Sequence, residues 1–201
     1  MFERDIIRQL SAWKMDVNRK PLVIHGARQV GKTWALKYFG KVYFEDVAYF
    51  SLDKDESGLC DIFKTTKDPR RIIQQLSFLH GKKINPQTTL LILDEIQECN
   101  EALNALKYFC EEAPEYAVAC AGSLLGIYLN HIGNSFPVGK VNHLSMYPLT
   151  FTEFLKTKDP NMYEYLCFIK EIAPLPQIFF DKLRDCLLYT SPSPRDGLLS
   201  R

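Results

Sequence analysis

The sequence lacks any apolar run long enough to cross a membrane, and it has almost no net charge. A membrane-spanning helix needs about 20 consecutive apolar residues, and the N-terminal stretch MFERDIIRQL carries charges where a secretory signal has its apolar segment. The 25 basic and 24 acidic residues leave a formal net charge of +1, so the overall charge gives no sign of a polyanionic partner. We therefore expect a cytoplasmic protein with no membrane partner.

Paired cysteine spacing is also lacking. None of the six cysteines forms a CxxC pair, and the four histidines show no metal-ligand spacing. Several cysteines lie in segments with the composition of a protein core. These features argue against a zinc centre and a disulfide framework, and we expect mainly buried free thiols.

The last stretch, 186–201, breaks from the composition before it and reads CLLYTSPSPRDGLLSR. Residues 186–196 match, in order, the translation of one frame of a common transposon-based sequencing adapter. A native Ser/Pro-rich linker is the alternative, but a linker has no reason to match a fixed run of codons. We interpret the stretch as adapter-derived and expect the natural protein to continue past Asp185.

The rest of the chain alternates between helical and strand patterns. Apolar residues at helical spacing predict helices over 3–14, 33–39, 68–80, 103–113, 151–155 and 161–172, with Gly40 and Gly81 as two helix ends. Apolar and β-branched runs predict strands over 22–25, 42–52, 89–93, 116–120 and 141–147. The continuous apolar run at 89–93 is typical of a strand buried on both faces. The expected fold class is therefore α/β, with a doubly wound, mainly parallel sheet.

A phosphate-binding loop is the clearest motif, because residues 26–33 read GARQVGKT and match GxxxxGK[ST]. The strand pattern PLVIH precedes it and the helix-compatible WALKYF follows it. Glycines permit close backbone approach to phosphates, the lysine reaches the β- and γ-phosphates, and the hydroxyl binds Mg²⁺. We expect the whole loop to bind ATP, largely through its backbone: Gly26, Ala27, Arg28, Gln29, Val30, Gly31, Lys32 and Thr33.

A carboxylate pair follows the apolar strand LLIL, where the sequence continues Asp94-Glu95. Open α/β sheets bind ligands at the carboxyl ends of their strands. We expect Asp94 to hold Mg²⁺ through its water shell, as a Walker-B aspartate does, and Glu95 to polarise the attacking water as a general base. An Asp-Glu pair can also simply cap the next helix, so this assignment depends on the loop at 26–33.

Two further side chains at predicted strand ends have two interpretations each. Ser123 follows the strand pattern YAVACAG and either senses the γ-phosphate or the attacking water, or caps the next helix. Asp53 ends the second predicted strand with the same ambiguity. Both assignments stay open at this stage.

Together these motifs resemble the prokaryotic ATP-binding proteins of the AAA class that carry an uncharacterised DUF4143 domain after the ATPase core. The resemblance covers 1–185 and rests on RKPLVIHGARQVGKT, LLILDEIQ, the strand ending in AGSLLG, and PVGKV followed by MYPLTFTEFL. It implies a P-loop NTPase of the additional-strand (ASCE) type. The additional strand would lie between the P-loop strand and the Walker-B strand, placing Ser123 beside both motifs.

One departure from the family pattern concerns arginine. Many relatives have Gly-Arg before the final strand, whereas this chain has Gly139-Lys140, and no arginine occurs between Arg71 and Arg184. An arginine finger contributes about 10³- to 10⁵-fold in rate. A slow ATPase, a finger from the following region, or Lys140 as a substitute all remain open, and an ordinary surface lysine is the alternative for Lys140.

The sequence thus predicts a Mg²⁺-dependent ATP-binding protein, an ATPase whose hydrolysis changes the conformation of a C-terminal domain. The expected catalytic residues are Lys32, Glu95 and Ser123. The alternative is a nucleotide-switched module with little turnover that docks a protein or DNA partner. We expect an ATPase core over 1–150, a helical segment over 151–185 that leads to the C-terminal domain, and the adapter-derived stretch 186–201.

Overall fold

The computed structural model describes residues 4–53, 58–122, 139–169 and 174–190. The chain divides into two compact units, one formed by Ile6–Met146 and the other by Met1–Asp5 together with Tyr147–Arg201. In the described ranges, no helix combines the length and apolar character needed to cross a membrane.

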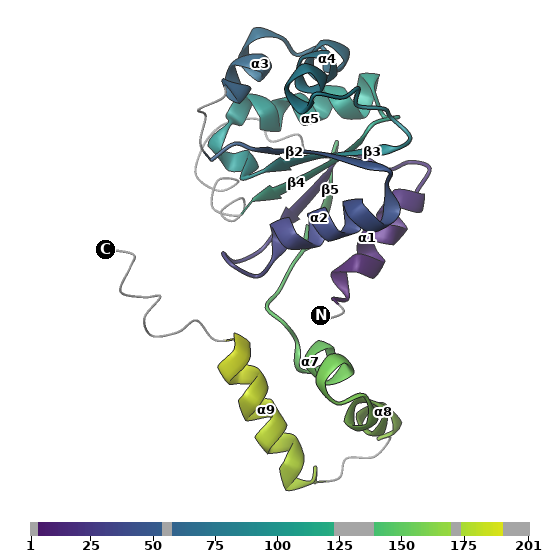
Figure 1. The fold of residues 1–201 in the computed structure, drawn as a ribbon, viewed down its shortest axis with the longest axis vertical. Coiled ribbons are helices and arrows are strands. Elements are labelled where there is room, and N and C mark those ends of the chain that lie inside the picture. Colours follow the sequence, from purple (N-terminus) through teal and green to yellow (C-terminus); the bar gives the residue numbers. More distant parts are fainter. Residues whose placement is uncertain (1–3, 54–57, 123–138, 170–173, 191–201) are drawn as a thin grey trace, which may run out of the picture. The chain divides into compact units, whose positions relative to one another are not determined.

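A parallel sheet forms the centre of the first unit (Figure 1). Its five strands, counted over the described residues, are β1 Leu22–His25, β2 Asp46–Ser51, β3 Thr89–Asp94, β4 Ala117–Gly122 and β5 Asn142–Ser145. They lie in the order β2-β3-β4-β1-β5, and all neighbouring pairs are parallel. Strand β4 therefore lies between β1 and β3, as the additional strand of this fold class should, and the predicted α/β P-loop class is confirmed.

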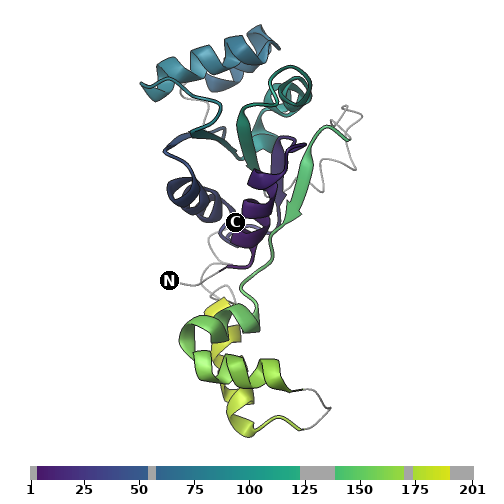
Figure 2. The ribbon, with the colours of Figure 1, turned by 90° about the vertical axis from the view of Figure 1, so that its right-hand side faces the viewer.

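Helices cover both faces of this sheet, as Figures 1 and 2 show. One face packs against α1 and α2, and the other against α3, α4 and α5. Side chains of β3 alternate between the two cores, with Leu91 and Leu93 on one side and Leu90 and Ile92 on the other, which explains the unbroken apolar run of this strand. The helices are α1 Ile6–Met15, α2 Lys32–Tyr43, α3 Leu59–Thr65, α4 Pro69–His80 and α5 Asn100–Glu112, with a short 3₁₀ helix, η2, at Ile96–Glu98.

Helix α4 has the ends that its sequence predicts. The Asp68 side chain accepts a hydrogen bond of 2.9 Å from the Arg70 N–H, Pro69 occupies the first turn, and Gly81 closes the helix at φ 74°. A proline at the start and a left-handed glycine after the end are the usual helix boundaries.

The predicted end of α2 at Gly40 is wrong, because the helix continues to Tyr43. A Cβ at position 40 would lie 2.6 Å from Val47 Cγ2 and 3.2 Å from Leu90 Cδ2. Glycine is therefore needed here for close packing of the helix on the sheet, and it does not terminate the helix. The longer helix also shortens the following strand, which was predicted over 42–52.

The second unit contains α7 Phe151–Lys158, α8 Pro160–Phe168 and α9 Gln177–Thr190. Its small apolar cluster is built around Phe154, Leu155, Phe179 and Cys186. Helix α9 continues through Cys186, the first residue of the adapter-like stretch, to Thr190.

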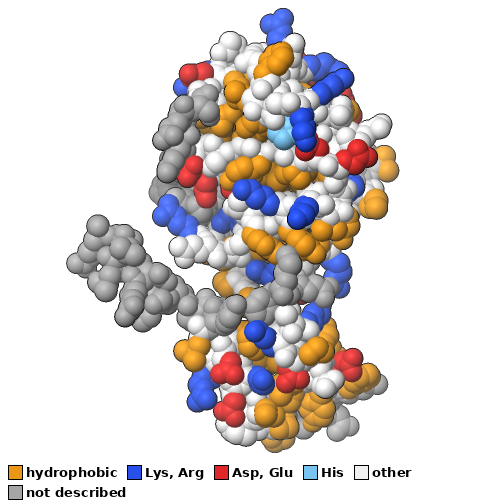
Figure 3. Space-filling model, viewed as in Figure 1, with side chains coloured by type: hydrophobic (Ala, Val, Ile, Leu, Met, Phe, Trp, Pro, Cys, Tyr) orange, Lys and Arg blue, Asp and Glu red, His pale blue; other side chains and the backbone are white. Residues whose placement is uncertain are grey.

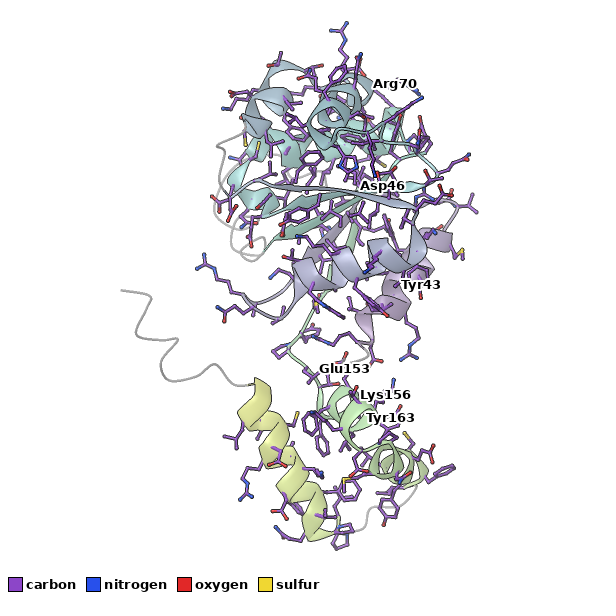
Figure 4. The ribbon with its side chains drawn as sticks, viewed as in Figure 1. Tyr43, Asp46, Arg70, Glu153, Lys156 and Tyr163 are labelled. Carbon is purple, nitrogen blue, oxygen red and sulfur yellow. The ribbon has the colours of Figure 1, made fainter. Side chains whose placement is uncertain are left out.

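A buried carboxylate joins the start of the chain to α7 within this unit (Figure 4). Glu153 Oε1 accepts hydrogen bonds from Arg4 Nε at 3.2 Å and from the Asp5 N–H at 2.8 Å. Its Oε2 accepts from the Thr150 N–H at 2.9 Å, which completes a capping box at the start of α7. The Lys156 ammonium, in turn, lies 3.3 Å from Asp5 Oδ1. These contacts attach Arg4 and Asp5 to α7 in the second unit.

The six cysteines are free thiols, and Cys60, Cys99, Cys120 and Cys186 are buried. Burial raises the pKa of the Cys99 and Cys120 thiols. They therefore stay protonated at neutral pH and act as small apolar side chains, in agreement with the sequence analysis.

Candidate nucleotide site

The loop at 26–33 connects the carboxyl end of β1 to the first turn of α2. Gly31 has φ 95° and directly precedes the helix, and Gln29 is also left-handed at φ 62°. A Cβ at Gly26 would lie 2.1 Å from the carbonyl oxygen of Met146, so this position accepts only glycine without a backbone shift. The backbone therefore turns sharply into a helix N-terminus, where N–H groups and the helix dipole favour an anion.

Lys32 is the first residue of α2, and its side chain folds back over the loop. The residue is 7% exposed, and its ammonium donates hydrogen bonds to the carbonyls of Gly26 at 3.0 Å and Ala27 at 2.7 Å. Burial lowers the pKa of Lys32, while the carboxylates of Glu95 and Asp94 act on it in the opposite direction. The two carboxylates therefore favour the charged form of Lys32, against the effect of its burial.

Asp94 is the last residue of β3 and is 5% exposed. Its Oδ2 accepts a hydrogen bond of 2.9 Å from the Tyr49 hydroxyl, and its Oδ1 accepts one of 3.1 Å from the Glu95 N–H. Burial, together with the Asp94 carboxylate, raises the pKa of Tyr49 to about 12. The tyrosine therefore stays a neutral donor and holds the carboxylate in one orientation.

Glu95 has a left-handed backbone, with φ 51° and ψ 47°, at the point where β3 turns into η2. This conformation is uncommon for a residue other than glycine and is found at strained functional positions. Gln97 Nε2 donates a hydrogen bond of 2.5 Å to Glu95 Oε2. Gln97 is only 5% exposed, and among the described residues its Oε1 has no hydrogen-bond partner.

Strand register brings the two motifs to one edge of the sheet. His25, immediately before the loop, is paired with Gly122, and Cys120 is paired with Leu93, immediately before Asp94. The carboxyl ends of β1, β4 and β3 therefore meet at the same edge, where α/β sheets bind ligands.

The other residues that the sequence predicts for the site differ in where they lie. Thr33 is half-buried in the first turn of α2, and Arg28 is exposed. Asp53 is exposed beside the same edge and accepts a hydrogen bond of 2.7 Å from Ser51 Oγ. Ser123 follows β4 but lies outside the described residues.

Lys140 lies at the amino end of the parallel strands, opposite the carboxyl end where the loop 26–33 begins. It precedes β5, whose first residue Asn142 is paired with Leu22 at the start of β1. At about 3.3 Å per residue, roughly 20 Å of strand separates Lys140 from the loop, which is beyond the reach of a lysine side chain. Its ammonium instead lies 2.9 Å from Glu111 Oε1. Lys140 does not act on the loop of its own chain.

Sequence reasoning missed Tyr49 and Gln97. Gln97 stands two residues after Glu95 in LLILDEIQ, but the left-handed turn that brings the two side chains together has no clear sequence signal. Tyr49 comes from a different strand, so only the pairing of β2 with β3 places it beside Asp94.

The fold and the loop define a nucleotide-binding protein of the P-loop class. Residues 18–155, more than half of the chain, match the family model described as AAA domain. The chain belongs to this family and is an AAA-type ATP-binding protein. A comparison with curated proteins gave no match.

Solved structures with a similar fold include AMPPCP-bound DnaA from Aquifex aeolicus, at 16% identity and a TM-score of 0.47 over 97% of this chain and 58% of that one. C. elegans PCH-2 is similar at 11% identity and a TM-score of 0.49, over 95% of this chain and 58% of that one. Aeropyrum pernix ORC1, in complex with DNA, is similar at 13% identity and a TM-score of 0.47, over 82% of this chain and 50% of that one. This chain thus spans between half and three fifths of these proteins.

Proposed function

We propose that the chain binds Mg²⁺ and ATP at the loop 26–33 and hydrolyses ATP, and that hydrolysis changes the conformation of the part of the protein that follows the sheet. The observation that supports this most is the strand register, which brings the end of β1 before the loop and the end of β3 at Asp94 to the same edge of the sheet, with Lys32 and Asp94 both buried there. This arrangement supports a site that combines a candidate phosphate-binding lysine, a candidate metal-binding aspartate and a candidate general base.

The residues at this edge suit a magnesium ion. The Thr33 hydroxyl and the Asp94 carboxylate are hard oxygen ligands, which Mg²⁺ prefers. Asp94 is buried, and its carboxylate accepts a hydrogen bond from Tyr49. Metal ligands in proteins are usually oriented by hydrogen bonds of this kind. When bound, the ion would supply positive charge to the β- and γ-phosphates.

The roles of the chain's own residues follow from their contacts. Lys32 would exchange its bonds to the carbonyls of Gly26 and Ala27 for bonds to phosphate oxygens. Glu95 would accept a proton from the attacking water, as a general base within hydrogen-bond reach does. Gln97 would hold Glu95 in position through its 2.5 Å hydrogen bond.

A nucleotide-switched docking module with little turnover is the second candidate. The arginine-free sequence between Arg71 and Arg184 favours it, as does the position of Lys140 at the other edge of the sheet. Without a finger from another chain or region, hydrolysis lacks a contribution of about 10³- to 10⁵-fold. The two candidates share the same ATP site and differ in rate.

Phosphate release under single-turnover conditions, measured beside the binding of a fluorescent ATP analogue, tests the proposal. We expect slow, Mg²⁺-dependent release by the wild type and loss of binding in Lys32→Ala. Glu95→Gln should still bind but release phosphate about 100-fold more slowly, because it lacks the base. Lys140→Ala serves as the matched lysine control and should behave as the wild type.

Tight binding of Mg·ATP without detectable release would reject hydrolysis and favour the switch. Normal release by Glu95→Gln would reject the assigned base. For the conformational part, hydrogen exchange of 147–169 should differ between Glu95→Gln loaded with ATP and the wild type loaded with ADP, and identical exchange would reject it.

A further inference from the structure

A groove with a cavity volume of about 640 Å³ runs along α4. None of the residues assigned to the candidate nucleotide site lines it. One wall is formed by α4 residues from Arg70 to Gly81, and the other by Lys82, Ile84 and Tyr116. Ile84 lies ahead of β3, and Tyr116 directly precedes β4. The groove therefore lies at the amino edge of the sheet, whereas the candidate nucleotide site lies at the carboxyl edge. Arg70 and Asp46 are labelled in this region in Figure 4.

The charged residues that line the groove are all basic. Of its ten lining residues, Arg70, Lys82 and Lys83 are basic and none is acidic. Lys83 is exposed and has no ion-pair partner within the described ranges. Arg70 lies 3.3 Å from Glu115 and Lys82 lies 3.9 Å from Asp46, but both basic side chains are about two-thirds exposed or more. Exposed ion pairs of this kind contribute little free energy, so both cations can also interact with an incoming anion.

The centre of the groove is apolar. Ile73 and Ile84 form a buried floor, and Phe78 stands at the rim with 75% of its surface exposed. Leu79, the next residue, is also more than half exposed. Figure 3 shows apolar and basic side chains next to one another over this end of the first unit. An exposed aromatic side chain beside an apolar floor is the usual anchor point of a protein interface.

The length of the groove indicates the kind of ligand. From Arg70 on α4 to Gly81, which closes the helix, the lining residues extend over about three helical turns, or about 16 Å at 1.5 Å per residue. Arg70 lies at one end, and Lys82 and Lys83 lie just after the other. A compact anion would contact only one end. A peptide segment as long as two to three helical turns would contact both ends of the groove and its apolar centre together.

We propose that this groove docks an acidic peptide segment of a partner protein, with an apolar side chain at its centre and carboxylates toward both ends. The apolar residue packs on Phe78, Ile73 and Ile84, and the carboxylates pair with Arg70 at one end and with Lys82 and Lys83 at the other. Nucleic acid fits less well, because its affinity depends mainly on many phosphate contacts, whereas the centre of this groove is apolar.

Selection of a random 12-residue peptide display library against the full chain tests the proposal. We expect enriched peptides with a central Leu, Ile or Phe flanked by Asp or Glu. Their affinity, measured by fluorescence anisotropy, should fall at least about tenfold in Lys83→Glu, which adds a like charge, and in Phe78→Ala, which removes the anchor. Lys107→Glu, the same charge change at an exposed position of α5 outside the groove, should leave the affinity within about twofold.

Both groove substitutions are at exposed positions, and unchanged thermal unfolding will show that the variants fold. An absence of enrichment, enrichment of basic peptides, or peptide binding that is insensitive to Lys83→Glu and Phe78→Ala would overturn the proposal. The proposal would also be overturned if a 20-nucleotide single-stranded DNA bound at the same residues more tightly than the peptides. Self-association of the chain in sedimentation experiments that Phe78→Ala abolishes would overturn it too. Because the groove is at the other edge of the sheet, Lys32→Ala should bind the peptides normally.

Discussion

The Tyr49 hydroxyl donates a hydrogen bond of 2.9 Å to Asp94 Oδ2, from the edge strand β2 to the end of β3. Because burial and Asp94 raise the pKa of Tyr49 to about 12, the hydroxyl keeps its proton throughout the working pH range. The edge strand thus supplies the donor that orients the candidate magnesium ligand.

Tyr49→Phe removes this donor while keeping the ring. We expect the Mg²⁺ concentration that half-saturates ATP binding to rise about tenfold, because hydrogen bonds around a metal ligand commonly contribute 10- to 100-fold to metal affinity. A titration of Mg²⁺ at fixed fluorescent ATP analogue measures this change. Tyr165→Phe, an exposed tyrosine of α8, is the matched control. An unchanged Mg²⁺ dependence in Tyr49→Phe would contradict the role of Tyr49 in orienting a metal ligand.

Gln97→Leu tests whether the buried amide positions Glu95. We expect phosphate release to slow about tenfold with little change in KM, because the substitution removes a hydrogen bond to the candidate base and leaves the phosphate-binding loop intact.

A purely structural role for Gln97 would lower thermal stability without slowing phosphate release, and that result would contradict the positioning role. Gln74→Leu is the control, since this glutamine is exposed on α4.

Gly40→Ala should destabilise the first unit although alanine is the better helix former. Alanine in a helix interior gains about 1 kcal/mol over glycine, but the new methyl would stand 2.6 Å from Val47 Cγ2, and overpacking costs about 1–3 kcal/mol. Urea unfolding should therefore show a net loss of about 1 kcal/mol.

The double variant Gly40→Ala/Val47→Ala removes the methyl that the new Cβ would meet. Its loss should be smaller than the sum of the two single losses by about 1 kcal/mol. Additive losses would show that the close approach of α2 to Val47 does not limit the residue at position 40.

The contact between His80 and Asp46 should make stability depend on pH in the acidic range. His80 Nε2 lies 2.7 Å from Asp46 Oδ2, and this hydrogen bond is the main reason that the pKa of Asp46 falls below its ordinary value of 3.8. A carboxyl with a lowered folded-state pKa stabilises the fold above its unfolded pKa and loses that contribution as the pH falls through the folded value.

Asp46→Asn should therefore be less stable than the wild type at pH 7, and the difference should shrink as the pH drops below about 4. Urea unfolding at pH 7, 4 and 3 measures it, with His80→Ala as a second variant that should flatten the same pH dependence. A constant difference between Asp46→Asn and the wild type at all three pH values would show that the Asp46 charge is not responsible.

Local signals in the sequence predicted much of this fold. The ends of α4 follow from Asp68, Pro69 and Gly81, and the β1 strand follows from the run before the loop, because these patterns act over a few residues. The end of α2 was predicted wrongly because Gly40 is required by Val47 and Leu90, which are distant contacts. Tyr49 and Gln97 reach the candidate site through strand pairing and a left-handed turn, which a single sequence does not display. The assignments of the loop residues, Asp94, Glu95 and Ser123 to catalysis stay predictions.

Gly26 lies directly against the backbone of Met146, so the start of the loop 26–33 and the end of the first unit are in close contact. The Met146 N–H donates a 2.8 Å hydrogen bond to the carbonyl of His25, and the Met146 carbonyl oxygen occupies the space that a side chain at Gly26 would need. Met146 is also the last residue of the first unit, and Tyr147 begins the helical part of the other. A side chain at position 26 would therefore displace the backbone at Met146, the residue after which the chain leaves the first unit.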